Sequence, residues 1–254
     1  MALPYGTIRL DLRVHHQSDN DDLVTKGKQR GSDCRQHMKA KPPKIQETAM
    51  DRLDAFVQTA ASYFPCTYHS TVRSLVQGTV LDLGCGKAWT WRFCRLTPRS
   101  KDSLTVGADI SQPYLEYCQA KECYQDLIRC DASNLPFKDA SFDAVLLLQL
   151  IEHFRKEEGL RLIKEAERIA RKQVILGTPV GFLGFDFHLS GWLPEELETL
   201  GYTVTGHGIR LPRPENRARG IMVQLSRVSC LFPFTYRLPG AAYQMLAFKR
   251  MRNE

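Results

Sequence analysis

The pattern of apolar and polar residues divides the chain into a polar arm and an ordered domain. Residues 1–44 show no sustained apolar period of 2 or 3.6, which predicts a mobile N-terminal arm. From Ile45 to Phe64 the apolar residues recur mainly at steps of three and four, the stripe of an amphipathic helix. A second helix is predicted over Tyr68 to Val76. The ordered domain is therefore expected to occupy residues 45–254.

Short apolar runs alternate with helical patterns from residue 78 onward. Strands are predicted at residues 79–83, 104–108, 126–130, 142–148, 173–176, 202–209 and 243–249. Helices are predicted at residues 88–96, 112–121 and 157–170, and from Pro194 onward. This alternation is typical of a mostly parallel sheet with helices on both faces, so the fold class is α/β and Rossmann-like. We expect a cofactor-binding core over residues 78–209, an insertion over 210–241, and a last strand and tail over 242–254.

The turn after the first predicted strand contains two glycines in the segment Asp82-Leu-Gly84-Cys85-Gly86. Glycines there let the backbone turn sharply and approach a ligand closely. A dinucleotide-binding loop would have a third glycine where Trp89 stands. The sequence therefore argues against NAD or FAD, and a dehydrogenase is the least favoured function.

Two further acids end the next two predicted strands. Asp109 follows Gly86 by 23 residues, near where an acidic side chain accepts hydrogen bonds from ribose hydroxyls. Asp131 is followed by Ala132 and could accept a hydrogen bond from an adenine amino group. Either aspartate alone could be a turn or cap residue. Together and in this order, they predict a site for an adenosine-containing cofactor between Asp82 and Asp109.

This combination resembles the class I S-adenosylmethionine-dependent methyltransferases, in particular their small-molecule, type 11-like subgroup. The resemblance runs from about residue 78 to residue 201 and implies a seven-stranded sheet whose last strand is antiparallel. It implies S-adenosylmethionine as the cofactor, bound by Asp82, Gly84, Cys85, Gly86, Asp109, Ile110, Asp131, Ala132 and Gln149. Two positions depart from the family pattern. Ala88 replaces a glycine often found in the loop, which predicts a narrower pocket, and residues 170–173 replace the usual turn before the fifth strand.

Candidates for catalysis follow the fourth and fifth predicted strands, which border the methyl group in this fold. His153, expected in the helix after the fourth strand, could accept a proton from a hydroxyl or carbon acid, or could simply be a helix residue bonded to its neighbours. His188 lies in a glycine-punctuated loop after the fifth strand and could act as base or binding residue. The aromatic residues of this region could form the wall of an acceptor pocket or a lid without substrate contact: Phe182, Phe185, Phe187 and Trp192.

Metal sites are not expected. The eight cysteines form no Cys-x-x-Cys pair, no histidine stands at finger-like spacing from them, and no cluster of acids with an asparagine indicates a divalent ion. The cysteine usage fits a reducing compartment, and no run reaches the length of a membrane-spanning helix. We therefore expect a soluble, cytoplasmic protein.

The net charge of +7 is concentrated at the end of the chain. Residues 205–254 carry nine basic and two acidic side chains, whereas residues 51–204 carry 17 and 20. The basic and aromatic insertion could contact a membrane surface, cap a pocket for an anionic or lipid-like acceptor, or serve as a plain structural cap.

The sequence thus predicts direct methyl transfer to a small-molecule or lipid-like acceptor, with possible peripheral membrane contact and no nucleic-acid partner. Two alternatives stay open: an RNA methyltransferase, and a non-catalytic S-adenosylmethionine-binding protein.

Overall fold

The computed structural model describes residues 56, 59–60, 63–89, 94, 104–182, 187–210 and 233–251. They form a seven-stranded sheet in the order β3-β2-β1-β4-β5-β7-β6. Strand β7 runs antiparallel to both of its neighbours, β5 and β6, as predicted for the last strand. The strands are β1 (Val80–Leu83), β2 (Thr105–Asp109), β3 (Asp126–Arg129), β4 (Phe142–Leu148), β5 (Ala170–Pro179), β6 (Thr203–Ile209) and β7 (Ala242–Arg250).

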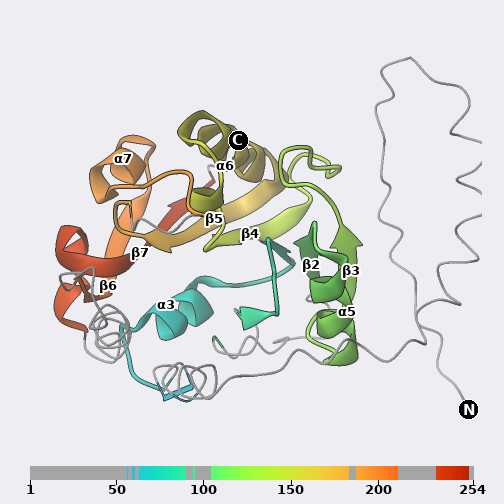
Figure 1. The fold of residues 1–254 in the computed structure, drawn as a ribbon, viewed down its shortest axis with the longest axis horizontal. Coiled ribbons are helices and arrows are strands. Elements are labelled where there is room, and N and C mark those ends of the chain that lie inside the picture. Colours follow the sequence, from blue (N-terminus) through green and yellow to red (C-terminus); the bar gives the residue numbers. More distant parts are fainter. Residues whose placement is uncertain are drawn as a thin grey trace, which may run out of the picture.

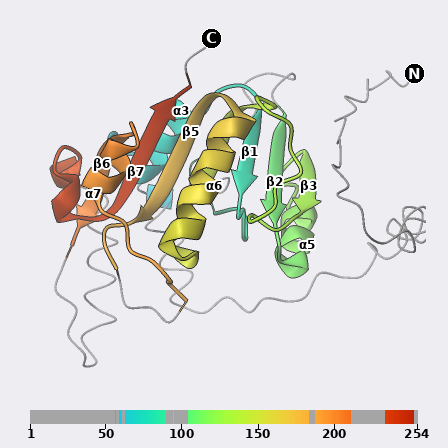
Figure 2. The ribbon, with the colours of Figure 1, turned by 90° about the horizontal axis from the view of Figure 1, so that it is seen from above.

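Helices cover both faces of this sheet (Figure 1). Helices α3 (Tyr68–Leu75) and α5 (Gln112–Ala120) lie on one face, and α6 (Lys156–Ile169) and α7 (Pro194–Thr199) lie on the other. Figure 2 shows α6 in front of β4 and β5, with α3 behind the sheet. This arrangement confirms the predicted Rossmann-like α/β class.

The central strand β4 contributes side chains to the hydrophobic cores on both faces of the sheet. All seven of its residues are buried. Val145 and Leu147 belong to the core beneath α6, whereas Leu146 and Leu148 belong to the core beneath α3. Because successive side chains of a strand point to opposite faces, a continuous apolar run is what a strand buried on both faces requires.

Strand β5 is longer than predicted and begins directly where α6 ends. Arg171 and Lys172, expected in a turn, lie within this strand. Arg171 Nε and Lys172 Nζ lie 3.0 and 3.1 Å from Asp143 Oδ1, so both cations are paired at the start of the strand. The backbone N–H of Thr79 also donates to this carboxylate, and Asp143 thereby ties β1 to β5 across β4.

Strands β6 and β7 form the predicted antiparallel pair around the insertion, and Ile209 pairs with Ala242 where the chain leaves and re-enters the sheet. Within the described part of the insertion, short 3-10 turns occupy Pro233–Thr235 and Pro239–Ala241. The predicted arm over 1–44 and most of the predicted helices over 45–64 and 88–96 lie outside the described residues. No helix in the described ranges is long and apolar enough to cross a membrane.

Candidate active site

The loop after β1 is fixed by hydrogen bonds to the end of β2. The N–H groups of Gly84 and Cys85 donate to the carbonyl of Ala108, at 2.8 and 3.1 Å. Gly84 and Gly86 adopt left-handed φ values of +68° and +52°. Such values favour glycine, so the two glycines are explained by the backbone itself. A Cβ placed on Gly86 would meet no atom nearer than 3.9 Å, and the loop is therefore open on that side.

Asp109 lies directly beside this loop. Its Oδ2 accepts a hydrogen bond from the N–H of Gly86 at 2.9 Å, and its Oδ1 accepts one from the N–H of Ser111 at 2.8 Å. A carboxylate has about four acceptor positions, so both oxygens retain capacity for ligand hydroxyls. The structure thus brings together the glycine loop and the acid that the sequence pairs with it, in an arrangement that fits a ribose.

Asp82 and Cys85 lie beneath the loop rather than on its open side. The Asp82 side chain is buried, and its Oδ2 accepts a hydrogen bond from the Tyr124 hydroxyl at 2.6 Å. The Cys85 side chain packs with Ala88 and Cys118. A hydrogen bond with Cys118, together with burial, raises the pKa of the Cys85 thiol. Because its side chain is buried beneath the loop, Cys85 can contact a cofactor only through its backbone atoms.

Ala88 corrects one expectation. Its φ of +56° is again left-handed, which explains why a glycine is common at this position. Its methyl group is fully buried in the cluster around Cys85, so the methyl does not narrow an open pocket.

The other predicted cofactor residues lie on exposed segments at the same edge of the sheet. Ile110 is exposed beside Asp109, and the N–H of Cys130 donates to the Asp109 carbonyl, which holds the end of β3 close. Asp131 is exposed, and a hydrogen bond from the Ser133 backbone lowers its pKa. Ala132 packs partly against the main core. Gln149, directly after β4, is exposed and has a left-handed φ of +58°. A non-glycine residue in this conformation is strained, and such strain is concentrated at functional sites.

A cluster that the sequence did not predict lies beyond β4 and β5. Glu152, His153 and His188 each place one nitrogen or carboxylate oxygen within 4.8 Å of the others. His153 lies in a 3-10 turn, Ile151–His153, and not in the helix that was expected. Its Nδ1 lies 3.0 Å from the Phe187 carbonyl. Because a carbonyl can only accept, Nδ1 carries the proton in this bond, and Nε2 of the neutral ring keeps its lone pair.

Glu152 is the buried member of this cluster. Its side chain is 2% exposed, and the Thr178 hydroxyl donates to its Oε2 at 3.1 Å. Burial raises the pKa of Glu152 to about 7, and the hydrogen bond from Thr178 partly opposes this effect. The burial of Glu152 cannot be inferred from the amino-acid sequence, so the residue was not among the predicted site residues. The available signal was its position next to His153.

The segment that carries His188 is held against Glu152 by backbone contacts. The N–H groups of Leu189 and Ser190 both donate to the Glu152 carbonyl, at 2.8 and 3.2 Å. The Ser190 hydroxyl accepts a hydrogen bond from the indole of Trp192, which is fully buried. The suggestion that Trp192 forms an acceptor wall is therefore wrong, because its ring is an internal anchor. Phe182 and Phe187 are exposed, and Phe185 lies outside the described residues.

Tyr68 is a second residue that the sequence did not single out. It comes from α3, and its side chain is 7% exposed. Its hydroxyl has no hydrogen-bond partner in the part of the chain that the structure describes. A Cβ on Gly177 would overlap this hydroxyl, so Gly177 provides the space for it at the end of β5. Burial raises the pKa of Tyr68, and the nearby acids Glu152 and Asp82 add to this effect.

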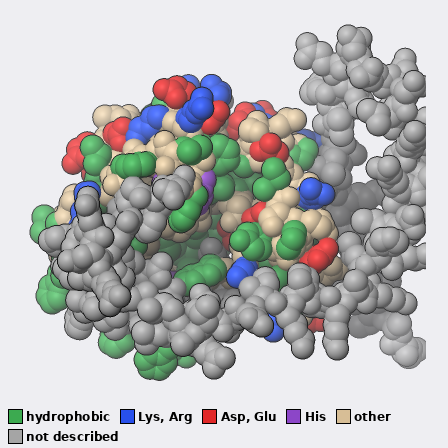
Figure 3. All heavy atoms as spheres, viewed as in Figure 1, with side chains coloured by type: hydrophobic (Ala, Val, Ile, Leu, Met, Phe, Trp, Pro, Cys, Tyr) green, Lys and Arg blue, Asp and Glu red, His purple; other side chains and the backbone are tan. Residues whose placement is uncertain are grey.

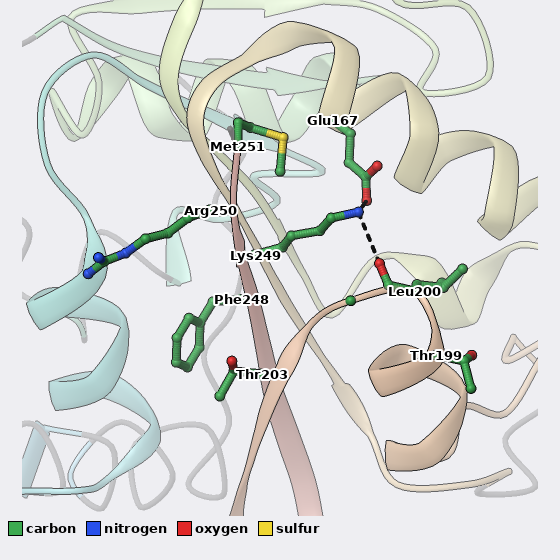
Figure 4. A pocket seen from close by; sticks show the side chains of 9 residues that line it. Glu167, Thr199, Leu200, Thr203, Phe248, Lys249, Arg250 and Met251 are labelled. Atoms are coloured by element: carbon green, nitrogen blue, oxygen red, sulfur yellow. Dashed lines mark hydrogen bonds and ion pairs between the residues drawn. The ribbon is translucent and has the colours of Figure 1, made fainter. Parts of the chain in front are cut away.

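A hollow of about 690 Å³ lies elsewhere, between the start of β6 and the end of β7 (Figure 4). Lys249 Nζ donates there to Glu167 Oε1 at 3.0 Å and to the Leu200 carbonyl at 2.9 Å. The start of β6 and the end of β7 lie at the amino ends of the parallel strands, whereas the glycine loop lies at their carboxyl ends. The hollow is therefore not part of the candidate site.

Part of the chain is similar to a known family of domains. Residues 81–176 match the model of a methyltransferase domain. The strand order and the glycine loop beside Asp109 agree with this match and with S-adenosylmethionine as the cofactor.

Individual relatives are similar to this chain over part of its length. Over 91 residues the chain is 35% identical to "Probable tRNA methyltransferase 9B" of Mus musculus, which is 35% of this chain and 19% of that protein. It is 31% identical to "Demethylmenaquinone methyltransferase" of Thermotoga maritima over 123 residues, 45% of this chain and 52% of that protein. A Thermotoga maritima crystal structure of a "SAM-dependent methyltransferase, possible histamine N-methyltransferase" is similar with a TM-score of 0.51 at 20% identity, covering 76% of this chain and 92% of that one. The chain thus spans about half or less of these two curated relatives.

Proposed function

We propose that this protein transfers a methyl group from S-adenosylmethionine directly to a small-molecule or lipid-like acceptor. The observation that carries the proposal is the open glycine loop bound to Asp109, at the same sheet edge as His153 and His188. Ligands of open α/β sheets bind at the carboxyl ends of the strands, and both groups lie there.

The cofactor supplies a methyl group already activated by a sulfonium, so the protein has mainly to align the acceptor and exclude water. In the proposed assignment, Asp109 accepts hydrogen bonds from the ribose, and Asp131 accepts one from the adenine. The Ile110 side chain packs on the same nucleoside. His153, with Nδ1 held by the Phe187 carbonyl, presents Nε2 to the acceptor and can take its proton. The His188 ring lies beside the His153 ring, with 5.2 Å between the ring centroids, and binds the acceptor.

The acceptor side favours a molecule with apolar and anionic parts. Phe182, Phe187 and Leu189 are exposed large apolar side chains that follow β5. Figure 3 shows a histidine side chain at the surface near the middle of this face, next to hydrophobic side chains. The exposed Arg210 directly follows β6, and its guanidinium lies close to Gly181. These residues support an anionic or lipid-like acceptor, and the basic end of the chain would support contact with an anionic membrane surface.

RNA is the second candidate acceptor. It is favoured by the similarity to a protein named as a tRNA methyltransferase and by the nine basic against two acidic residues of positions 205–254.

Transfer of radiolabelled methyl from the cofactor into fractionated cell extract tests these proposals. At a cofactor concentration near the dissociation constant of the wild type, we expect label in the organic-soluble or small-molecule fraction, reduced with Asp109→Ala and retained with Asp126→Ala. Asp126 is a matched control because it is exposed at the start of β3, away from the loop. Label in material that nuclease destroys would favour RNA. Cofactor binding without label in any fraction would contradict transferase activity and favour a non-catalytic binding protein.

A further inference from the structure

We infer that Glu152, His153 and His188 bind one divalent first-row transition metal ion. Their three ligand atoms, two imidazole nitrogens and one carboxylate oxygen, lie within 4.8 Å of one another. In a bound site, neighbouring ligands about 2.1 Å from the ion are roughly 3.0 to 3.4 Å apart. Separations of up to 4.8 Å therefore have to shrink by at most about 1.8 Å before one ion can contact all three atoms. Two histidines and one carboxylate with open coordination positions suit Fe²⁺, Mn²⁺, Co²⁺ or Zn²⁺.

The burial of Glu152 supports a cation at this point. The side chain is 2% exposed, and it accepts a hydrogen bond from the neutral hydroxyl of Thr178. No lysine or arginine in the described ranges forms an ion pair with it. Charged carboxylates that are buried are normally paired or coordinate a metal. A divalent ion between Glu152 and the two histidines would provide the missing positive charge.

The orientation of His153 is a second, independent observation. Its Nδ1 donates to the Phe187 carbonyl, which leaves Nε2 as the nitrogen with a lone pair. Histidines that bind metals commonly donate their other N–H to a carbonyl or carboxylate, which fixes the tautomer and the direction of the ring. The same short segment carries both Phe187 and His188. One piece of chain thus orients one proposed ligand and supplies another.

The site is also held in place before any ion binds. The Glu152 carbonyl accepts hydrogen bonds from Leu189 and Ser190, and Ser190 is in turn bonded by the buried Trp192. The ligands from the 3-10 turn and from the segment after β5 are therefore joined through the backbone. A supported set of ligands of this kind is what a specific metal site needs.

Three protein ligands leave coordination positions on the ion for oxygen atoms of the acceptor, which favours transfer of the methyl group to oxygen. This choice of acceptor atom rests on the proposed function. With the ion bound, His153 Nε2 is a metal ligand and no longer the base proposed for the metal-free site. A hydroxyl bound to the ion loses its proton more readily, and this proton goes to solvent. The acceptor oxygen then forms a bond to the methyl carbon, and the electron pair of the broken carbon–sulfur bond stays on sulfur. The products are a methylated oxygen and S-adenosylhomocysteine.

Metal binding is tested on the full chain after treatment with a chelator and gel filtration. Calorimetric titration with Zn²⁺ and the visible spectrum with Co²⁺ report stoichiometry and affinity. We expect one ion per chain, with affinity at least about 10- to 100-fold weaker in Glu152→Gln, His153→Gln and His188→Gln. Glu157→Gln is the control, because Glu157 is an exposed acid five positions along the chain, and it should bind as the wild type does.

Two further measurements separate the remaining outcomes. X-ray absorption of the Zn²⁺-loaded wild type should show nitrogen and oxygen at about 2.0–2.1 Å, and it needs no variant to fold. Sulfur neighbours at about 2.3 Å, no one-to-one binding, or equal affinity in all variants would overturn the metal site. Titration with S-adenosylhomocysteine is independent of the metal: its failure in the wild type would contradict the proposed function and leave the metal result standing.

Discussion

Replacing Asp109 tests the cofactor site most directly. In Asp109→Ala the N–H groups of Gly86 and Ser111 lose their charged acceptor. Any ligand hydroxyl that the carboxylate binds loses its partner too. A hydrogen bond to a charged group is worth about 1.5–3 kcal/mol, and water can replace part of it at this half-buried position. We therefore expect cofactor binding to weaken by about 1–3 kcal/mol, a factor of about 5 to 150.

The variant Asp109→Asn separates loop support from ligand binding. Its amide keeps one acceptor oxygen but not two, so it can satisfy either the loop or the second N–H group, and we expect an intermediate loss of affinity. Calorimetric titration with S-adenosylhomocysteine measures the affinity, and a thermal melt reports the stability of each variant. Asp126→Ala serves as the control on the neighbouring strand. An affinity of Asp109→Ala within twofold of the wild type would remove this residue from the cofactor site.

Three further predictions follow from buried or strained residues. Burial lowers the pKa of His69 to about 4 and of His207 to about 3, so the neutral forms stabilise the fold above pH 6.5 and that contribution is lost as the pH falls toward these values. Between pH 7 and pH 5 we expect each histidine to lower the free energy of unfolding, measured with urea, by about 2 kcal/mol. The pH dependence of this free energy should be smaller in the variant with glutamine at both positions, and an unchanged pH dependence would refute the prediction. Gly84→Ala should lower the melting temperature more than Gly86→Ala, because only the Cβ at position 84 would lie 2.6 Å from a neighbouring side chain. Gly86→Ala should mainly weaken cofactor binding. A larger drop in melting temperature for Gly86→Ala than for Gly84→Ala would contradict the loop geometry. Trp192→Ala should cost about 3–5 kcal/mol in the free energy of unfolding, and a loss below about 1 kcal/mol would show that the ring is not the anchor described above.

The sequence predicts the parts of the fold that depend on local pattern. Strand β4 matches its predicted range because its buried run is continuous, and Asp109 is placed beside Gly86 because adjacent parallel strands end at one edge of the sheet. The start of β5 was not predictable in this way. Arg171 and Lys172 have the composition of a turn, and only their ion pairs with Asp143 explain why they lie in a strand.

The acceptor side depends on contacts between distant segments, and there the sequence is less informative. Glu152 is polar and lies near the start of a helix, where an exposed acid is ordinary. It becomes a candidate ligand only because the segment around His188 folds back onto its carbonyl. Trp192 was predicted to be part of a pocket wall or of a lid, and its burial in the core was not predictable because it depends on the same fold-back of the chain.

The pairing of Ile209 with Ala242 has a consequence for how this domain can be altered. The chain leaves β6 and enters β7 at adjacent points at the carboxyl ends of the parallel strands. The segment between the two strands can therefore change length without shifting the register of either strand. Doubling such a stretch adds only about 0.6 kcal/mol of closure entropy. New acceptor preferences could therefore be introduced at this junction while β1 and the glycine loop after it keep their geometry, because β4, β5 and β7 separate β1 from β6.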